Sequence, residues 1–196
     1  MKKIIIIGAG FAGLSSLAVL SKNTAALGLN LTLINDKDYF SFLPMLPDCL
    51  GRGINPNNLA YDLRVLSRKK NFSFIKDRVL AIDLKKREVR TTALKLDYDF
   101  LIIASGSETN FYGNQQIKES ALKLDDVSDA SLMAEAIKNR SYENYLIAGG
   151  GYTGIEVATN LRRYLKIRLA KKDHYSGARF FGPRPLAFMD EGLCLG

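Results

Sequence analysis

Six glycines in two groups of three are the residues whose types and spacing point most directly to chemistry. They are Gly8, Gly10, Gly13, Gly149, Gly151 and Gly154. In each Gly-x-Gly-x-x-Gly turn, the first glycine adopts a conformation closed to other residues, the second lets a pyrophosphate approach the main chain, and the third lets helix and strand pack closely. The positive end of the following helix then stabilises the phosphates without a lysine or an arginine. The two groups therefore predict two dinucleotide-binding turns.

Each glycine group lies between a predicted strand and a predicted helix, which is the context that a functional turn needs. The isoleucine-rich run Lys2–Ile7 suits a strand buried on both faces, and apolar residues at helical spacing follow from Leu14 onward. The run Leu29–Asn35 supplies the next strand and completes a βαβ unit. Tyr145–Ala148 is the strand that enters the second turn. The alternative to a nucleotide site, for either turn, is a tight glycine loop without function.

Four further elements are predicted between the two turns. Asparagine and proline at Asn55 and Pro56 indicate the start of a helix, and short β-prone runs separated by charged turns indicate strands. The elements are a helix that begins at Asn55 and buries Leu59, Leu63 and Leu66, a small antiparallel meander over Asn71–Thr92, a buried strand over Tyr98–Ser107, and a helix over Val127–Asn139.

The second strand of the first βαβ unit should end in an acidic residue that binds the ribose hydroxyls. Here the strand ends in Asn35 and Asp36. Asn35 stands where the acid is usual and can accept one hydrogen bond, whereas Asp36 serves if the strand end is displaced by one residue. The alternative role for Asp36 is that of a turn residue before Lys37, and the sequence leaves these interpretations open.

The composition is that of an ordinary globular protein, with 47% hydrophobic and 24% charged residues in 196. Cys49 and Cys194 lie far apart, which argues against a disulfide scaffold or a metal site and favours a reducing, cytoplasmic setting. The apolar run behind the N-terminal lysines is too short for a signal peptide. No segment approaches the roughly 18 apolar residues of a membrane span, so any membrane contact is expected to be peripheral.

The net charge of +8 is concentrated in one part of the chain. Between Leu161 and Arg184 there are eight lysines and arginines against one aspartate. No helix-turn-helix, zinc finger or aromatic RNA-binding motif accompanies this charge, so no nucleic-acid partner is expected. We interpret the segment as a solvated basic tail.

Four stretches, in this order and spacing, carry a resemblance to a known family. They are "IIIIGAGFAGLSS", "DYFSFLPMLPDCLGRGINPNNLAYDLR", "LDYDFLIIASGSETNFYG" and "LIAGGGYTGIEVATNL". Over Met1–Arg168 the chain resembles the N-terminal half of the two-dinucleotide-domain flavoproteins of the pyridine nucleotide-disulfide oxidoreductase superfamily, most of all the type II NADH dehydrogenases. The resemblance implies an FAD-dependent oxidoreductase in which a hydride passes from NADH, or NADPH, to the flavin and then to a quinone or another acceptor.

The resemblance also assigns residues to the two cofactors. In that family the first turn holds FAD, the segment Phe42–Pro44 lies near the flavin, and the strand end Ala104–Gly106 packs against it. The implied FAD site comprises Gly8, Gly10, Phe11, Ala12, Gly13, Asn35, Asp36, Lys37, Pro44, Val79, Ala104, Ser105 and Gly106. The implied NAD(P)H site comprises Gly149, Gly151, Tyr152, Thr153 and Gly154, with Tyr152 in place of the proline common in the family.

Glu156 matches a family glutamate near the nicotinamide and the flavin, where it is implicated in positioning the quinone or moving protons. A carboxylate suits proton delivery to a quinone that takes up two electrons. The alternative role is a first-turn glutamate favoured by the helix dipole. Hydride transfer itself needs no catalytic triad, because the cofactors carry the chemistry and the protein aligns them.

A single cysteine near the flavin excludes one branch of the superfamily. Enzymes that reduce disulfides carry a Cys-x-x-x-x-Cys pair, whereas Pro44 and Ile54 stand five residues either side of Cys49. Cys49 is interpreted as a small buried apolar residue, with a sulfide-reactive thiol as the alternative.

The implied fold is α/β: a Rossmann-like FAD-binding domain with a small antiparallel β-meander over residues 1–110, plus the start of a second Rossmann-like NAD(P)-binding domain over residues 111–170. Residues 171–196 read as an aberrant or disordered basic tail with no strand and no helical period. The family pattern calls for a strand here that ends in the acid binding the NADH ribose. Read one nucleotide later, the codons for Lys172–Gly177 can encode such a strand and its glutamate.

We therefore expect the chain to be a truncated or frame-shifted fragment with little activity alone. Most of the NADH domain, the returning part of the FAD domain and the family's C-terminal membrane-binding segment are then missing. The alternative function is a catalytically silent dinucleotide-binding or interaction module. The full-length family implies a cytoplasmic protein that is peripheral at the cytoplasmic membrane face.

Overall fold

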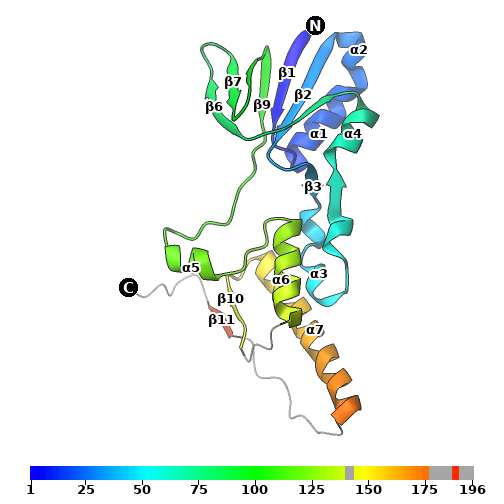
Figure 1. Cartoon of the computed structure of the whole chain (residues 1–196), viewed down its shortest axis with the longest axis vertical. Helices are drawn as coiled ribbons and strands as arrows, with labels where there is room; N and C mark the ends of the chain where they lie inside the picture. Colours follow the sequence, from blue (N-terminus) through cyan, green and yellow to red (C-terminus); the bar gives the residue numbers. More distant parts are fainter. Residues whose placement is uncertain (140–143, 177–186, 190–196) are drawn as a thin grey trace. The chain divides into compact units, whose positions relative to one another are not determined.

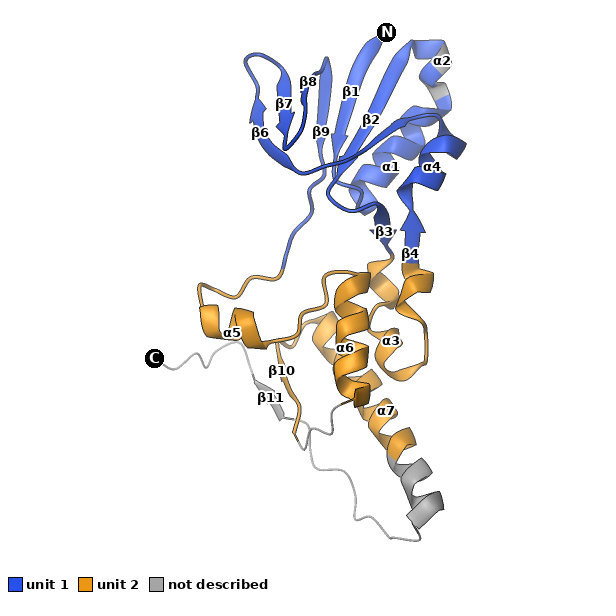
Figure 2. Ribbon diagram, in the orientation of Figure 1, with its two compact units in different colours: residues 1–41, 60–108 blue, residues 42–59, 109–196 orange. Residues whose placement is uncertain are grey.

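The structure is a computed structural model that describes residues 1–139, 144–176 and 187–189 (Figure 1). The chain forms two compact units, Met1–Ser41 with Ala60–Glu108 and Phe42–Leu59 with Thr109–Gly196 (Figure 2). Residues 42–59, which the sequence analysis places in the first domain, thus pack with the second unit. The boundaries of the two cofactor-binding domains stay predictions.

The first unit is built on a parallel sheet with the strand order β5-β2-β1-β9. The strands are β1 (Lys2–Ile7), β2 (Leu29–Asn35), β5 (Ser73–Lys76) and β9 (Phe100–Ile103). β1 pairs in parallel with β2 and β9, and β2 pairs in parallel with β5. The strands predicted over Lys2–Ile7 and Leu29–Asn35 are confirmed to the residue. The predicted α/β fold class is also confirmed.

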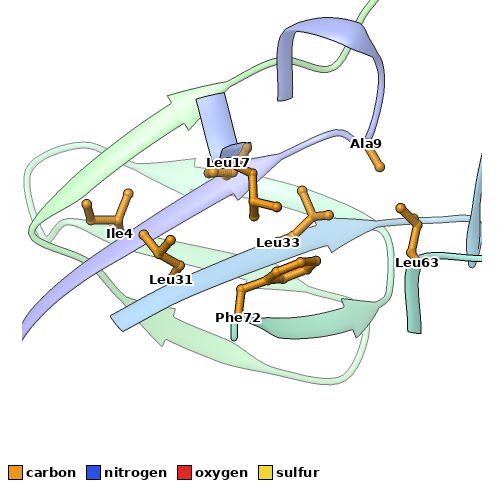
Figure 3. Close-up of a cluster of buried hydrophobic side chains, with 8 residues drawn as sticks. Ile4, Ala9, Leu17, Leu31, Leu33, Leu63 and Phe72 are labelled. Atoms are coloured by element: carbon orange, nitrogen blue, oxygen red, sulfur yellow. The ribbon is translucent and has the colours of Figure 1, made fainter. Parts of the chain in front are cut away.

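The isoleucine run of β1 serves two cores because successive side chains of a strand point to opposite faces. On one face Ile4 and Ile6 pack with Leu17 of α1 (Phe11–Leu20) and Leu63 of α4 (Leu63–Lys70). Figure 3 shows this cluster around β1 and β2. On the other face Ile5 and Ile7 pack against the small antiparallel sheet described below. Burial on both faces explains why the strand lacks polar residues after Lys3.

The prediction of one continuous helix from Asn55 is wrong, because the middle of that range forms a strand. Asn55 Oδ1 accepts from Asn57 N at 3.0 Å, but only one turn, η3 (Pro56–Leu59), follows. The chain then extends as β4 (Ala60–Asp62) to pair antiparallel with β3 (Tyr39–Ser41). The Asp62 carboxylate accepts from Arg64 N and Val65 N, at 2.7 and 3.1 Å, and so caps a separate helix, α4. This distant strand pairing and the new cap together divide the predicted helix.

The antiparallel meander exists, but its membership differs from the prediction. Its strands are β6 (Val79–Asp83), β7 (Glu88–Thr91) and β8 (Lys95–Asp97). The expected first strand, Phe72–Ile75, instead corresponds to β5, which follows the crossover helix α4 and joins β2 in parallel. A short apolar run fits either sheet equally well, so only the pairing distinguishes them.

The expectation of a buried strand in Tyr98–Ser107 is wrong in part. β9 lies at the edge of the sheet among the described residues, and its Phe100 and Ile103 are 56% and 59% exposed. Leu101 and Ile102 pack against the two cores. This apolar strand thus pairs with one edge of β1, and among the described residues no strand pairs with its other edge.

The second unit is mainly helical within the described residues. Its elements are η2 (Leu43–Met45), α3 (Asp48–Gly51), η3, α5 (Gln115–Ser120), α6 (Val127–Asn139), β10 (Leu146–Ala148), α7 (Tyr152–Ser176) and β11 (Ala187–Met189). Its core joins Leu50 of α3, Met133 and Ile137 of α6, and Leu161 of α7. The helix predicted over Val127–Asn139 is confirmed to the residue. Two short helices of the first unit, η1 (Ser21–Asn23) and α2 (Thr24–Leu27), connect α1 to β2.

The expectation that residues 171–196 hold no helix or strand is wrong at two places. Helix α7 continues to Ser176, and β11 pairs in parallel with β10, with Ala148 opposite Met189. The apolar triplet Ala187–Met189 is too short to stand out in a periodicity analysis. Residues 177–186 and 190–196 lie outside the described residues, and the frame-shift interpretation stays a prediction. No described helix has the length and apolarity of a membrane span.

Candidate dinucleotide-binding site

The first glycine turn joins β1 to α1 in the first unit. Gly8 has a φ of 98°, and a Cβ there would lie 2.1 Å from the carbonyl oxygen of Ala104. A Cβ on Gly13 would lie 1.9 Å from the carbonyl oxygen of Gly8. Gly10 is different, because a Cβ there meets no described atom within 4 Å. Gly8 and Gly13 are required by the fold, whereas the main chain at Gly10 is open to a ligand.

The first turn of α1 carries no acidic residue, and Gly10 precedes the helix without a side-chain cap. The first helical hydrogen bond runs from Leu14 N to Gly10 O at 3.0 Å. Phe11 at the first helical position packs edge to face on Phe40, with ring centroids 5.1 Å apart. The helix end is therefore suited to an anion and is braced by an aromatic pair.

Asn35 holds the turn through both ends of its side-chain amide. Its Oδ1 accepts from Ala9 N at 3.0 Å, and its Nδ2 donates to the carbonyl oxygen of Lys37 at 2.8 Å. Its own carbonyl accepts from Asp77 N at 3.0 Å. An aspartate could not supply the donor that Lys37 requires, which gives a physical reason for asparagine at this position.

Asp36 contrasts with Asn35. It is exposed, and among the described residues no group bonds to its carboxylate. The Lys37 ammonium lies 5.9 Å from the centre of the Tyr39 ring. Of the two candidates for binding the ribose, Asp36 keeps both carboxylate oxygens for a ligand, whereas Asn35 Oδ1 already accepts from Ala9 N.

The remaining residues assigned to FAD fall in both units. Ala104 N donates to Ile7 O at 2.8 Å, so the strand end beside Gly8 is fixed, and Gly106 has a φ of 71°. Val79 packs against the core between the sheet and the meander. Pro44 belongs to η2 of the second unit and is exposed. Gly8, Asn35 and Ala104 are therefore brought together in one unit, and Pro44 lies in the other.

The second glycine turn repeats the backbone of the first. Gly149 has a φ of 103°, and a Cβ on Gly154 would lie 2.2 Å from the Gly149 carbonyl oxygen. Ile155 N donates to Gly151 O at 3.1 Å, as Leu14 N does to Gly10 O. A Cβ on Gly149 or Gly151 meets no described atom within 4 Å. The turn has the geometry of a nucleotide-binding turn, with fewer neighbours than the first.

The side chains at the start of α7 point to solvent within the described residues. Tyr152 is 91% exposed, and Thr153 and Glu156 are also exposed. Glu156 is the fifth residue of α7, and the first turn of that helix holds no acidic residue. The interpretation of Glu156 as a first-turn, dipole-stabilised residue is therefore wrong. Its role at the reaction centre stays a prediction.

Cys49 is buried, as the sequence analysis expects of a small apolar residue. It is 7% exposed, and its thiol lies 3.8 Å from the carbonyl oxygen of Met45. Burial, with the nearby Asp48 carboxylate, raises the pKa of the thiol. A raised pKa disfavours the nucleophilic thiolate.

Two polar contacts that shape the site are not among the sequence predictions. One is the double hydrogen bond of Asn35, and the other is a hydrogen bond from Asn160 Nδ2 to Asp48 Oδ1 at 3.1 Å. Asparagine in the ribose position was a signal for the first. For the second, 112 residues separate the partners, and no local pattern announces it.

Comparison with known proteins gives a consistent result. Residues 2–173 match the family described as pyridine nucleotide-disulphide oxidoreductase. A type II NADH:quinone oxidoreductase of Staphylococcus saprophyticus is 29% identical over 168 residues, which are 79% of this chain and 42% of that protein. An external alternative NAD(P)H-ubiquinone oxidoreductase B4 of Arabidopsis thaliana mitochondria is 24% identical, over 87% of this chain and 33% of its own.

Two solved structures resemble the chain closely in fold. NDH2 from Plasmodium falciparum in complex with NADH has a TM-score of 0.73 at 26% identity, over 88% of this chain and 39% of its own. The sulfide:quinone oxidoreductase of Aquifex aeolicus has a TM-score of 0.69 at 25% identity, over 86% and 40%. The chain thus spans less than half the length of these relatives.

Proposed function

The chain belongs to the pyridine nucleotide-disulphide oxidoreductase family, and from this premise we propose that its function is FAD-dependent oxidation of NADH or NADPH by a quinone or another small acceptor. The observation that carries the proposal is the repeated turn geometry. A Cβ added to the third glycine would lie 1.9 Å from the carbonyl oxygen of the first glycine in the first turn, and 2.2 Å from it in the second turn. A Cβ added to the second glycine meets no described atom within 4 Å in either turn. A pyrophosphate fits where the second glycine is bare.

In this proposal the first turn holds FAD. Gly10 lets the pyrophosphate approach the main chain, and the N-terminus of α1 stabilises its charge. Asn35 keeps the turn in shape through Ala9 N, and Asp36 accepts from the ribose hydroxyls. Phe11, Ala12, Lys37, Val79 and the strand end Ala104–Gly106 complete the site.

The second turn holds the pyridine nucleotide. Gly149, Gly151 and Gly154 form the pyrophosphate cradle, and Tyr152 and Thr153 lie exposed at the start of α7, where a ligand can meet them. When bound, FAD supplies the hydride chemistry, taking two electrons from the nicotinamide and passing them to the acceptor. The chain's part is to bind both cofactors, and the family resemblance assigns Phe42–Pro44 to the flavin.

Glu156 is proposed to act at the acceptor. Its carboxylate is exposed and has no hydrogen bond or ion pair with the described residues. It can therefore position a quinone or deliver the protons that a two-electron reduction consumes. A peripheral place at the cytoplasmic membrane face, where a quinone is reached, belongs to the same proposal.

The activity of this polypeptide by itself is proposed to be low, because the strand that enters the second turn has little support from neighbouring strands. Within the described residues, β10 pairs with one short strand, β11, whereas β1 is flanked on both sides. A catalytically silent dinucleotide-binding module is the second candidate, and it shares the turns but not the electron transfer.

The test uses one substitution in each turn. Because a Cβ at Gly10 or Gly151 meets no described atom within 4 Å, Gly10→Asp and Gly151→Asp leave the packing intact and place a carboxylate where a pyrophosphate should lie. Gly10→Asp should weaken FAD binding at least about 100-fold and spare NADH binding, because two anions cannot share the site. Gly151→Asp should do the reverse.

Binding is followed by the flavin spectrum for FAD and by calorimetry for NADH. Asn57→Asp, which adds the same charge on exposed η3, serves as the control and should bind both ligands normally. Bleaching of bound flavin by NADH supports the oxidoreductase, and binding without bleaching supports the silent module. Absence of flavin binding by the wild-type chain, or equal loss from both turns, would contradict the proposal.

A further inference from the structure

A buried polar contact joins α3 and α7 within the second unit. Asn160 is 6% exposed, and its Nδ2 donates to Oδ1 of Asp48 at 3.1 Å. The same carboxylate oxygen lies 3.1 Å from Nε of Arg52. Asp48 is thus held between a buried amide and an arginine, and Asn160 supplies the contact from α7.

The two backbones also meet at this point. A Cβ on Gly51 would lie 2.3 Å from the carbonyl oxygen of Asn160, so only glycine lets α3 approach this closely. Beside it, Leu50 packs with Leu161 in the core of the unit. Figure 1 shows α3 against α7. A side-chain hydrogen bond, a close backbone approach and an apolar contact therefore join the two helices, within four residues of α3 and two residues of α7.

Each helix carries one part of the proposed reaction centre. Pro44, in the exposed segment assigned to the flavin, stands four residues before Asp48. The second glycine turn opens α7, and Asn160 follows Gly154 by six residues, which is about 9 Å along a helix. A fixed α3–α7 contact fixes the flavin segment relative to the pyridine-nucleotide turn.

We propose that Asn160 is a positioning residue for hydride transfer, which acts through Asp48 to hold the Phe42–Pro44 segment in register with the second glycine turn. The inference rests on the proposed function, because it assumes a pyridine nucleotide at that turn. The part of Asn160 is to make α3 and the start of α7 open and close as one body.

A coupled pair of helices has a measurable signature. Ligand at about 100 times its Kd slows by about 100-fold the hydrogen exchange of every amide that opens only together with the binding site. The reporters in α3 are the amides of Cys49, Leu50 and Arg52, which donate to Leu46, Pro47 and Asp48 carbonyls at 3.1, 3.2 and 2.9 Å. The reporter at the turn is Ile155 N.

The decisive variant is Asn160→Asp. It keeps the shape but sets a second carboxylate at the 3.1 Å separation from Asp48, and like charges repel. Asn160→Leu, of similar size, removes the bond without adding charge and serves if the first variant folds poorly. The exchanged pair Asp48→Asn with Asn160→Asp restores a hydrogen bond in the opposite direction. Asn58→Asp, on exposed η3 of the same segment, is the matched control.

Exchange is measured on the full chain with and without NADH. In the wild type and in Asn58→Asp, NADH should slow the α3 reporters and Ile155 alike, by about 100-fold. In Asn160→Asp and Asn160→Leu, Ile155 should keep this slowing while the α3 reporters fall below about 3-fold. The exchanged pair should recover most of the lost effect.

The outcomes separate the two levels of inference. Slowing at the α3 reporters that survives in both Asn160 variants overturns the positioning role, and so does slowing in the wild type that is confined to Ile155. Both results leave the proposed function standing. A wild-type chain that does not bind NADH at all overturns the proposed function, and the positioning role with it.

Discussion

The two glycine turns have the same backbone but are held in different ways. In both, the first glycine has a φ near 100°, at 98° and 103°, and the third packs on the carbonyl of the first. The first turn is also held from outside, by Asn35 on Ala9 N and by Ala104 against Gly8. Within the described residues, no side chain bonds to the second turn. Local sequence thus sets the shape of such a turn, and distant contacts set its rigidity.

The largest expected difference between the turns comes from alanine at the first glycine. Gly8→Ala suffers both a strained φ and a Cβ 2.1 Å from Ala104 O, so it should lower the free energy of unfolding by about 3–5 kcal/mol. Gly149→Ala has the strained φ alone and should cost about 1–3 kcal/mol. Urea unfolding followed by circular dichroism measures both.

Gly28→Ala is the matched control for this comparison. It lies in the first unit at a φ of 57° with no described atom within 4 Å of a Cβ, so it reports strain without collision. Equal losses for Gly8→Ala and Gly28→Ala would show that Ala104 adds nothing to the rigidity of the first turn.

The second effect tests the side-chain brace. Asn35→Ala removes the acceptor of Ala9 N and the donor to Lys37 O, and should cost the first unit about 1–3 kcal/mol. FAD affinity should fall with it, because the turn loses its fixed shape. Asp36→Asn should also weaken FAD binding but leave the unfolding free energy unchanged, since nothing in the described chain bonds to that carboxylate. A stability loss in Asp36→Asn, or none in Asn35→Ala, would reverse the roles assigned to this pair.

The third effect is small and of opposite sign. Gly150 takes the place of Ala9 in the second turn, and a Cβ there meets no described atom within 4 Å. Gly150→Ala should therefore raise the free energy of unfolding by about 0.4–1 kcal/mol, because alanine restricts the unfolded chain more than glycine does. A lower free energy of unfolding in Gly150→Ala would reveal a close contact that makes the second turn as crowded as the first.

The smallest expected effect is a difference in how the stability of the two units depends on acidic pH. The hydroxyls of Thr91 and Thr92 hold the pKa of Asp77 below its ordinary value, and hydrogen bonds to Lys76 and Lys3 do the same for Asp38 and Asp97. A carboxylate with a lowered folded-state pKa stabilises the fold above its unfolded pKa, near 4, and this is lost as the pH falls. These three groups lie in the first unit.

In the second unit the Asp125 carboxylate behaves alike. Burial raises the pKa of Asp125, but hydrogen bonds from Thr109 and Lys123 outweigh it and leave the pKa lowered. The first unit should therefore lose more stability than the second between about pH 4 and pH 2. Asp77→Asn should flatten that loss. Exchange rates of β1 and α6 amides across this pH range provide the measurement, and a steeper loss in α6 would be the contrary result.

The elements that the sequence predicts correctly are those specified by residues close together in the chain. β1, β2 and α6 match their predicted bounds, because each is an apolar run or period interrupted by clear breakers. The division of the helix after Asn55 was not visible, since β4 forms only by pairing with β3 twenty residues earlier. The placement of β5 in the parallel sheet depended on pairing in the same way.

The candidate site shows the same limit. The glycines and the Asn35–Asp36 pair could be named from spacing alone, but not which of the two side chains is left for a ribose. That follows from Ala9 N and Lys37 O, which occupy both ends of the Asn35 amide. The contact of Asp48 with Asn160 spans 112 residues and depends on two helices packing, so no local period encodes it.

The packing of Phe42–Leu59 with the second unit has a consequence for synthesis on the ribosome. Leu50 is buried against Met133, Ile137 and Leu161, which are translated long after it. At about 5–20 residues per second, the roughly 110 residues from Leu50 to Leu161 take on the order of 6–20 s to appear. For that time the nascent chain carries an unpaired apolar segment between two strands of the first unit. A chaperone that holds this stretch would therefore set the yield of native protein.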